Sequence, residues 1–326
     1  MSSNGKPFVA FQDNPPLGDG QLQPVFILGD HRSGTTLLYQ LLARTMCFNV
    51  VTAYHILCYD QMIANYERGT EAQAQQQIAD LFAARGLTDR LIDEVKLTPD
   101  LPEEYGFLLR NAGFRAQLNS QNYPTFVELC RRIQYVSEPG KPLLLKNPWD
   151  YMNFTFIKTR LPEAKFIFVH RNPINVINSQ LRATRSLLQE KNEYVAMIAR
   201  WYAQLFNQPL RLRLSRALFK SPLGLRLVIR HVGQAGDYFL RHINTLATSD
   251  YVIVNYEDLC KDPNLIITSI LDFLQLPEEA VNGYEKMTRP RAGQLLNEVQ
   301  RNRQLIAKRV ASYAHFCGYD LDEIQG

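Results

Sequence analysis

A short stretch near the N-terminus, GDHRSGTT (29–36), gathers residue types that bind anions. It follows the apolar run PVFIL (24–28) and precedes an apolar helical pattern, and its glycines have the spacing of a phosphate-binding loop. Backbone N–H groups at the start of a helix bind phosphate through their donors and through the helix dipole. The sequence therefore predicts an anion site formed by Arg32, Ser33, Gly34, Thr35 and Thr36.

The loop departs from that of a nucleoside triphosphatase. In the pattern GxxxxGK[ST] a lysine precedes the final hydroxyl and contacts the phosphates, whereas Thr35 stands at that position here and the cation lies inside the loop as Arg32. The apolar run at 165–170 ends in His170 and Arg171, where such an enzyme needs an acidic ligand for Mg²⁺. Both departures favour a phosphate held directly by arginine, without a metal.

A second anion site is predicted in FVHRNPINVINSQL (168–181). Arg171 follows an apolar run, Asn172 and Pro173 suit the cap and first position of a helix, and Ser179 lies about two turns into that helix. Ligands of open parallel sheets bind at the carboxyl edge of the strands. Together the two sites predict a ligand with two separated anionic groups.

A parallel sheet is needed to position these residues. Continuous apolar runs followed by turn and helix patterns are typical of strands buried on both faces in successive βα units. The predicted strands are 24–28, about 48–51, 142–146, 165–170 and 251–256. We also expect helices at 34–46, at 149–160 and after Asn172. The predicted fold is α/β, with three α/β/α layers around a parallel sheet of about five strands, as in P-loop NTPases.

The chain of 326 residues is predicted to hold one domain. Residues 1–22, rich in Gly, Pro, Asn and Gln, are typical of a flexible leader. Residues 23–326 then form a single domain with a helical insertion at about 60–138, where a substrate lid would be expected. The five cysteines are scattered and form no CxxC pair, and no apolar run is long enough to span a membrane. These features predict a cytoplasmic protein.

Charge is distributed unevenly along the chain. The net charge of +4 is mild, and we expect no nucleic-acid partner. Residues 194–236 nevertheless contain seven Lys or Arg and no Asp or Glu. Within them, residues 207–232 are basic and amphipathic, which indicates either a solvated helical face or a surface for an acidic, glycan or lipid-linked acceptor, including peripheral contact with a membrane.

Four motifs in this order resemble the sulfotransferase family, which uses 3′-phosphoadenosine 5′-phosphosulfate (PAPS): RSGTTLL, LLLKNP, LPEAKFIFVHRNPINVINSQL and VNYEDLCKDP. The similarity covers residues 24–186 and 250–275 and is greatest to the bacterial and protein-tyrosine branch. It implies that residues 32–36 bind the 5′-phosphosulfate, that Arg171 and Ser179 bind the 3′-phosphate, and that Tyr256 lies against the adenine.

The resemblance also implies roles in catalysis and in closing over the donor. Lys146, in LLLKNP, matches the family lysine near the transferred sulfuryl group, and Arg32 would share the stabilisation of the leaving phosphate. The family closes over the adenine and 3′-phosphate with an Arg/Lys-Gly loop. Residues 288–293 and 300–303 are both candidates, with Arg289 and Arg291 preferred because Gly293 follows.

The family's catalytic base is missing from its usual positions. The tyrosyl-protein branch has a glutamate shortly after the second strand, where this chain has TAYH (52–55), and the cytosolic branch has a histidine after the lysine strand, where this chain has NPWD (147–150). His55 is the first choice because the ordinary pKa of histidine suits a base. The alternatives are Asp150, Asp60 and His31.

The expected activity is a metal-independent, in-line transfer of a sulfuryl group from PAPS to a hydroxyl or amine of a small-molecule, glycan or lipid-linked acceptor. Two other functions share the predicted fold. A P-loop small-molecule kinase is disfavoured by the missing lysine and acidic ligand. A catalytically silent nucleotide-binding protein would keep the anion loop and lose the base, and the missing glutamate leaves that reading open.

Overall fold

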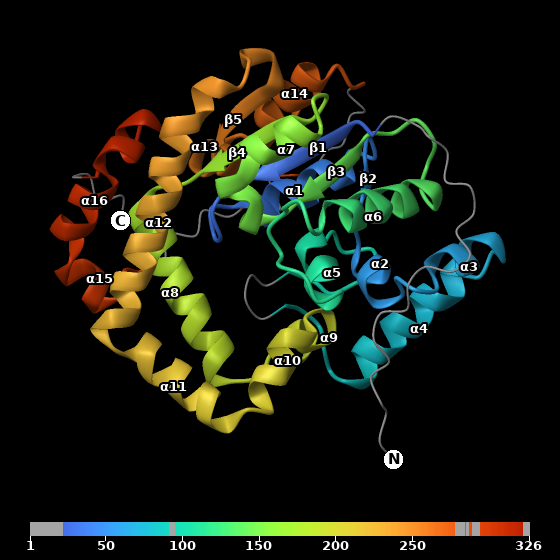
Figure 1. Ribbon diagram of the computed structural model, residues 1–326, viewed down its shortest axis with the longest axis horizontal. Helices are drawn as coiled ribbons and strands as arrows, with labels where there is room; N and C mark the ends of the chain where they lie inside the picture. The colour runs from blue at the N-terminus through green and yellow to red at the C-terminus, as the bar shows by residue number, and fades with distance from the viewer. Residues whose placement is uncertain (1–21, 91–94, 278–283, 285–286, 289–293, 322–326) are drawn as a thin grey trace.

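A five-stranded parallel sheet in the order β2-β3-β1-β4-β5 lies at the centre of the computed structural model (Figure 1). This confirms the predicted α/β architecture. The structure describes residues 22–90, 95–277, 284, 287–288 and 294–321. The strands are β1 (Pro24–Leu28), β2 (Asn49–Val50), β3 (Leu143–Lys146), β4 (Lys165–His170) and β5 (Tyr251–Asn255).

Alternate side chains of each strand face opposite sides of the sheet, as the pleat requires. Phe26 of β1 and Phe168 of β4 belong to one apolar cluster, whereas Ile27 and Ile167 of the same two strands belong to the other. Continuous apolar runs are therefore needed here, because both faces of the sheet are covered.

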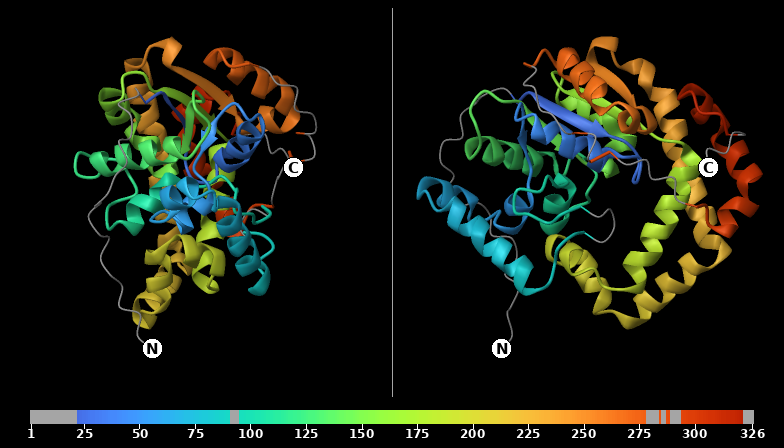
Figure 2. Two further views of the ribbon diagram at one scale, coloured as in Figure 1. Left: turned by 90° about the vertical axis from the view of Figure 1, so that its right-hand side faces the viewer. Right: turned by 180° about the vertical axis from the view of Figure 1, so that it is seen from behind.

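Helices cover the two faces and extend the molecule beyond the sheet (Figures 1 and 2). Those in the first half of the chain are α1 (Thr35–Arg44), α2 (Ala53–Leu57), α3 (Met62–Glu67), α4 (Glu71–Ala84), α5 (Tyr105–Asn111), α6 (Tyr123–Tyr135) and α7 (Phe154–Arg160), the last preceded by a 3₁₀ helix at Pro148–Asn153. Those in the second half are α8 (Pro173–Gln189), α9 (Glu193–Ile198), α10 (Arg200–Phe206), α11 (Pro209–Lys220), α12 (Pro222–His242), α13 (Tyr256–Lys261), α14 (Pro263–Leu274), α15 (Asn297–Arg301) and α16 (Arg303–Phe316).

The helical segment predicted as an insertion contributes to the apolar core. Tyr105 of α5 and Phe126 of α6 are fully buried, and their rings lie 6.3 and 6.2 Å from that of Phe26 in β1. This segment therefore forms part of the core on one face of the sheet, while α1 and α14 cover the other face.

Helices α8 to α12 form an arch that leaves the sheet after β4 and returns toward it before β5 (Figure 1). Helix α8 begins as predicted, with Pro173 at its first position and Asn172 Oδ1 accepting the Ile174 N–H at 3.0 Å. In the described part of the chain, no helix combines the length and the apolar composition that crossing a membrane requires.

Candidate functional site

The anion loop (residues 29–36) joins β1 to α1 through a backbone that favours glycine. Gly34 has φ of 106°, and a Cβ at this position would lie 2.3 Å from Cδ2 of Tyr256. A side chain here would thus clash with a buried ring that packs on the loop. Arg32 also has a positive φ, 71°. The loop is held in this shape by tertiary packing as well as by its own sequence.

The residues predicted to bind two anionic groups lie together at the carboxyl edge of the sheet. Arg32 Nε donates a hydrogen bond to Ser179 Oγ at 3.1 Å, and Arg171 Nη1 donates to the backbone oxygen of Arg32 at 3.2 Å. The guanidinium of Arg171 also lies 4.3 Å from the ring centroid of Tyr256. Four residues from three motifs thus form one basic and aromatic cluster, because β1, β4 and β5 are parallel neighbours.

Lys146 connects the anion loop with the helical insertion. Its side chain at the end of β3 is fully buried, its Nζ donates to Thr36 Oγ1 at 2.8 Å, and the same atom lies 3.0 Å from Glu104 Oε1. A buried ammonium group requires an opposite charge nearby, and Glu104 supplies it.

Glu104 is a site residue that sequence reasoning missed. Burial by itself raises the pKa of this carboxyl group, but the positive charges of Lys146 and Arg90 and the hydrogen bond with Lys146 outweigh burial and leave the pKa below its usual value. The carboxylate is therefore ionised at neutral pH and can accept a proton.

A pairing between distant segments brings Glu104 to the second strand. Thr52, just after β2, forms an antiparallel bridge with Pro102, and the Glu103 N–H donates to the Val51 oxygen at 2.8 Å. A glutamate does lie beside the end of the second strand, but it comes from far along the chain. The sequence feature that could have indicated Glu104 is the pair of adjacent acids at 103 and 104, just before a helix.

His55, the first choice as base, instead caps α2. Its Nδ1 accepts the Thr52 N–H at 3.1 Å, and its own N–H donates to Thr52 Oγ1 at 3.3 Å. Burial lowers the pKa of this imidazole to about 4. These contacts give His55 a structural role at the start of the helix.

The two aspartates named as alternatives have different surroundings. Asp150 is fully buried and accepts hydrogen bonds from the Leu118 N–H at 2.8 Å and from Nδ2 of Asn147 and Asn153. Burial raises the pKa of Asp150 despite these bonds. The hydrogen bonds of its carboxylate link the segment after β3 to the insertion. Asp60 is exposed to solvent.

A large cavity of about 1270 Å³ opens beside the anion loop. Both Thr36 and Glu104 line it, as does His31, whose ring packs edge-on against Trp149 with centroids 5.1 Å apart. His55, Asp60 and Asp150 do not line it. The wall formed by the arch is mostly apolar or aromatic: Leu187, Val195, Trp201, Tyr202, Phe219, Leu227 and Val228.

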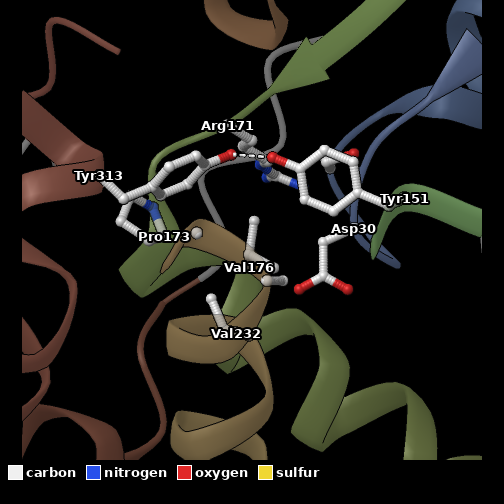
Figure 3. Close-up of a pocket in the computed structure, with 10 residues that line it drawn as sticks. Asp30, Tyr151, Arg171, Pro173, Val176, Val232 and Tyr313 are labelled. Atoms are coloured by element: carbon white, nitrogen blue, oxygen red, sulfur yellow. Dashed lines mark hydrogen bonds between the residues drawn. The ribbon is translucent and has the colours of Figure 1, made fainter. Parts of the chain in front are cut away.

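A small cavity of about 10 Å³ lies on another side of the loop, and Ser33 lines this one (Figure 3). Tyr151 and Tyr313 meet above it with hydroxyl oxygens 3.1 Å apart. Asp30 Oδ1, at its edge, lies 3.1 Å from His231 Nε2, and this hydrogen bond raises the pKa of His231. The side chain of Ser33 thus belongs to the support of the loop, and its backbone N–H donates to the Asp30 oxygen.

The predicted loop over the donor lies partly outside the described residues. Arg289 and Arg291 are not described, and the alternative at 300–303 forms the junction of α15 and α16. Among the described residues, no three His, Cys, Asp or Glu side chains are grouped as a metal site would require.

Comparison with known proteins gives a family match for the sequence and similar solved structures for the fold. Residues 24–220 match the model of a family described as "Sulfotransferase family". No curated protein matched the sequence. Two solved structures are similar to the chain: sulfotransferase STF1 from Mycobacterium tuberculosis H37Rv (17% identity, 90% of this chain and 77% of that one, TM-score 0.52) and sulfotransferase STF9 from Mycobacterium avium (17%, 94% and 80%, TM-score 0.55).

Proposed function

The chain belongs to the sulfotransferase family, and we propose that it transfers a sulfuryl group from PAPS to a hydroxyl or amine of an acceptor bound in the large cavity. The observation that carries the proposal is the position of Lys146. It contacts Thr36 of the anion loop on one side and the ionised Glu104 on the other. A cation between an anion site and a base is what in-line transfer to a neutral nucleophile requires.

The residues around the anion loop fit a donor with two anionic groups. The N–H groups at the start of α1 and the guanidinium of Arg32 suit the phosphosulfate, because both favour negative charge. Arg171 and Ser179 suit the 3′-phosphate, and Tyr256 offers an aromatic surface beside them. PAPS supplies the activated sulfuryl group. Arg32 and Lys146 stabilise the negative charge that develops on the departing phosphate.

Glu104 replaces His55 as the proposed base. It lines the cavity and is ionised, so it can accept the proton of an acceptor hydroxyl as the new bond to sulfur forms. His31, in the same cavity wall, has its pKa lowered by burial and stays neutral at pH 7. We propose that His31 and Trp149 position the acceptor.

The lining of the cavity supports an acceptor with an apolar body. The arch contributes aromatic and aliphatic side chains such as Trp201 and Phe219, whereas most polar groups come from the anion loop and from the insertion. This distribution suits a hydroxylated molecule of mainly hydrophobic structure better than a glycan. No disulfide joins any two of the five cysteines, all of which lie among the described residues; we propose a reducing, cytoplasmic compartment, as expected from their scattered positions.

Binding and transfer assays test this proposal. We expect adenosine 3′,5′-bisphosphate to bind in the presence of a metal chelator, and labelled sulfate to pass from PAPS to apolar alcohols in an acceptor panel. Arg32→Ala should abolish both signals. Binding of ATP only with Mg²⁺ would instead indicate a kinase. Tight bisphosphate binding with no transfer to any acceptor would indicate a silent binding protein.

A further inference from the structure

Four leucines are exposed on α11 and on the first half of α12, two consecutive helices of the arch (Figure 1). We call this segment, residues 207–232, the basic helix pair. Leu210 and Leu214 of α11 are 70% and 62% exposed, and Leu223 and Leu227 of α12 are 53% and 42% exposed. Single exposed leucines are ordinary, whereas a group of four within one short segment indicates a contact surface.

The spacing of these leucines places them on one face of each helix. Leu210 and Leu214 are four residues apart on α11, and exposed Ala217 continues the same stripe. The exposed cations Arg213 and Lys220 border this stripe on one side. On α12, Leu223 and Leu227 are again four apart, with exposed Arg226 and Arg230 beside them. Apolar stripes bordered by Arg and Lys are typical of helices that lie in a membrane interface.

Charge favours one kind of partner for this surface. Residues 194–236 contain no Asp or Glu, so nothing in the segment offsets its seven cations. We propose that the basic helix pair docks onto an anionic lipid surface, with its leucines among the acyl chains and its guanidinium groups on the phosphates. The contact is peripheral, and the helices lie along the surface.

Docking would bring the lipid surface to the rim of the large cavity. Leu227 is both part of the exposed leucine group and part of the cavity lining, and Phe219 and Val228 of the same helix pair line the cavity next to it. An amphipathic molecule dissolved in the membrane could then enter between apolar side chains without crossing water. Lipid binding itself does not depend on the proposed sulfuryl transfer.

Vesicle sedimentation tests the proposal with the intact chain. We expect the protein to sediment with vesicles of phosphatidylcholine and phosphatidylglycerol, to sediment less with phosphatidylcholine alone, and to be released by salt. Leu210→Glu with Leu214→Glu should lower the partition coefficient by about tenfold or more. The matched control is Leu265→Glu with Leu305→Glu, which changes two leucines that are 60% and 58% exposed on other helices and should leave it unchanged.

A second pair of variants isolates the contribution of charge. Arg213→Gln with Arg226→Gln should weaken binding to anionic vesicles and reduce its salt dependence. Arg68→Gln with Arg85→Gln removes two exposed cations elsewhere and should not. Bisphosphate binding by each variant confirms that it is folded.

Three results would overturn the proposal. The first is equal partition to anionic and neutral vesicles, and the second is an equal loss of vesicle binding in both leucine pairs. The third is self-association without vesicle binding: if sedimentation velocity gives a dimer that Leu210→Glu with Leu214→Glu converts to a monomer, the surface contacts a second copy of this chain.

Discussion

The proposed donor side and the proposed acceptor side of the site are built differently. The proposed donor residues belong to motifs that directly follow strands β1, β4 and β5: Arg32, Arg171, Ser179 and Tyr256. They are in contact because β4 pairs with both β1 and β5. On the acceptor side, Glu104 comes from the insertion and reaches the site through a bridge between residues 52 and 102. The donor side depends on sheet order, whereas the acceptor side depends on how one insertion packs.

The first test of this contrast is removal of the proposed base. Glu104→Gln keeps the size of the side chain but cannot accept a proton, so we expect kcat to fall about 10²- to 10⁴-fold. Bisphosphate affinity should change little, because the donor residues are untouched. Steady-state kinetics and calorimetry measure the two sides separately.

Glu103→Gln serves as the matched control for this variant. Glu103 is also buried, but it pairs with Arg90 and accepts the Tyr194 hydroxyl at 2.7 Å, and it does not line the large cavity. Its substitution should lower thermal stability with little effect on kcat. If kcat falls alike in both variants, Glu104 supports the fold and the assignment of the base is wrong.

Removal of a donor cation should have a smaller effect, on affinity. Arg171→Ala removes a guanidinium that contacts both the anion loop and Tyr256. A hydrogen bond to a charged group contributes about 1.5–3 kcal/mol, which corresponds to about ten- to a hundredfold weaker bisphosphate binding. Isothermal calorimetry measures the loss, with Arg160→Ala, at an exposed position, as control. Unchanged affinity would place the 3′-phosphate elsewhere.

His55→Ala should affect stability alone. The substitution removes the side-chain half of the capping box of α2, at an expected cost of about 1 kcal/mol in the free energy of unfolding. Chemical denaturation measures this cost, and kcat should remain within about twofold of the wild type because His55 lies outside the cavity. A loss of kcat as large as that of Glu104→Gln would restore His55 as the base.

The lowered pKa of His55 also predicts how stability depends on pH. Its pKa is about 4 in the folded protein against an ordinary value of 6.5. The unfolded chain therefore binds a proton between these values that the folded protein does not, and stability falls as pH decreases from about 6.5 toward 4. His170, with its pKa lowered by burial to about 3, acts in the same direction. Melting temperatures across this range should fall less steeply in His55→Asn; an unchanged slope would contradict the assignment.

Much of the fold could be predicted from the sequence, because the strands are continuous apolar runs and the helix after β4 has a clear start at Asn172 and Pro173. The contribution of α5 and α6 to the core was not apparent, since their apolar residues lie in a segment that is polar on average. Glu104 was missed because no local pattern links it to β2. Glu104 reaches the site through the bridge between Thr52 and Pro102, and no regular residue spacing in the sequence predicts that bridge.

The sequence by itself determined the strand, loop and helix layout around residues 29–36, the strands that precede the other motifs, and the family of the chain. These are local features, in which residue types and short spacings fix the backbone conformation. Only the tertiary structure decided which side chains face the cavity: it assigned His55 to a helix cap, Ser33 to the small cavity, and Glu104 to Lys146. The physical reason is that a buried charge must find its partner in space, and that partner can come from any segment that the packing brings close.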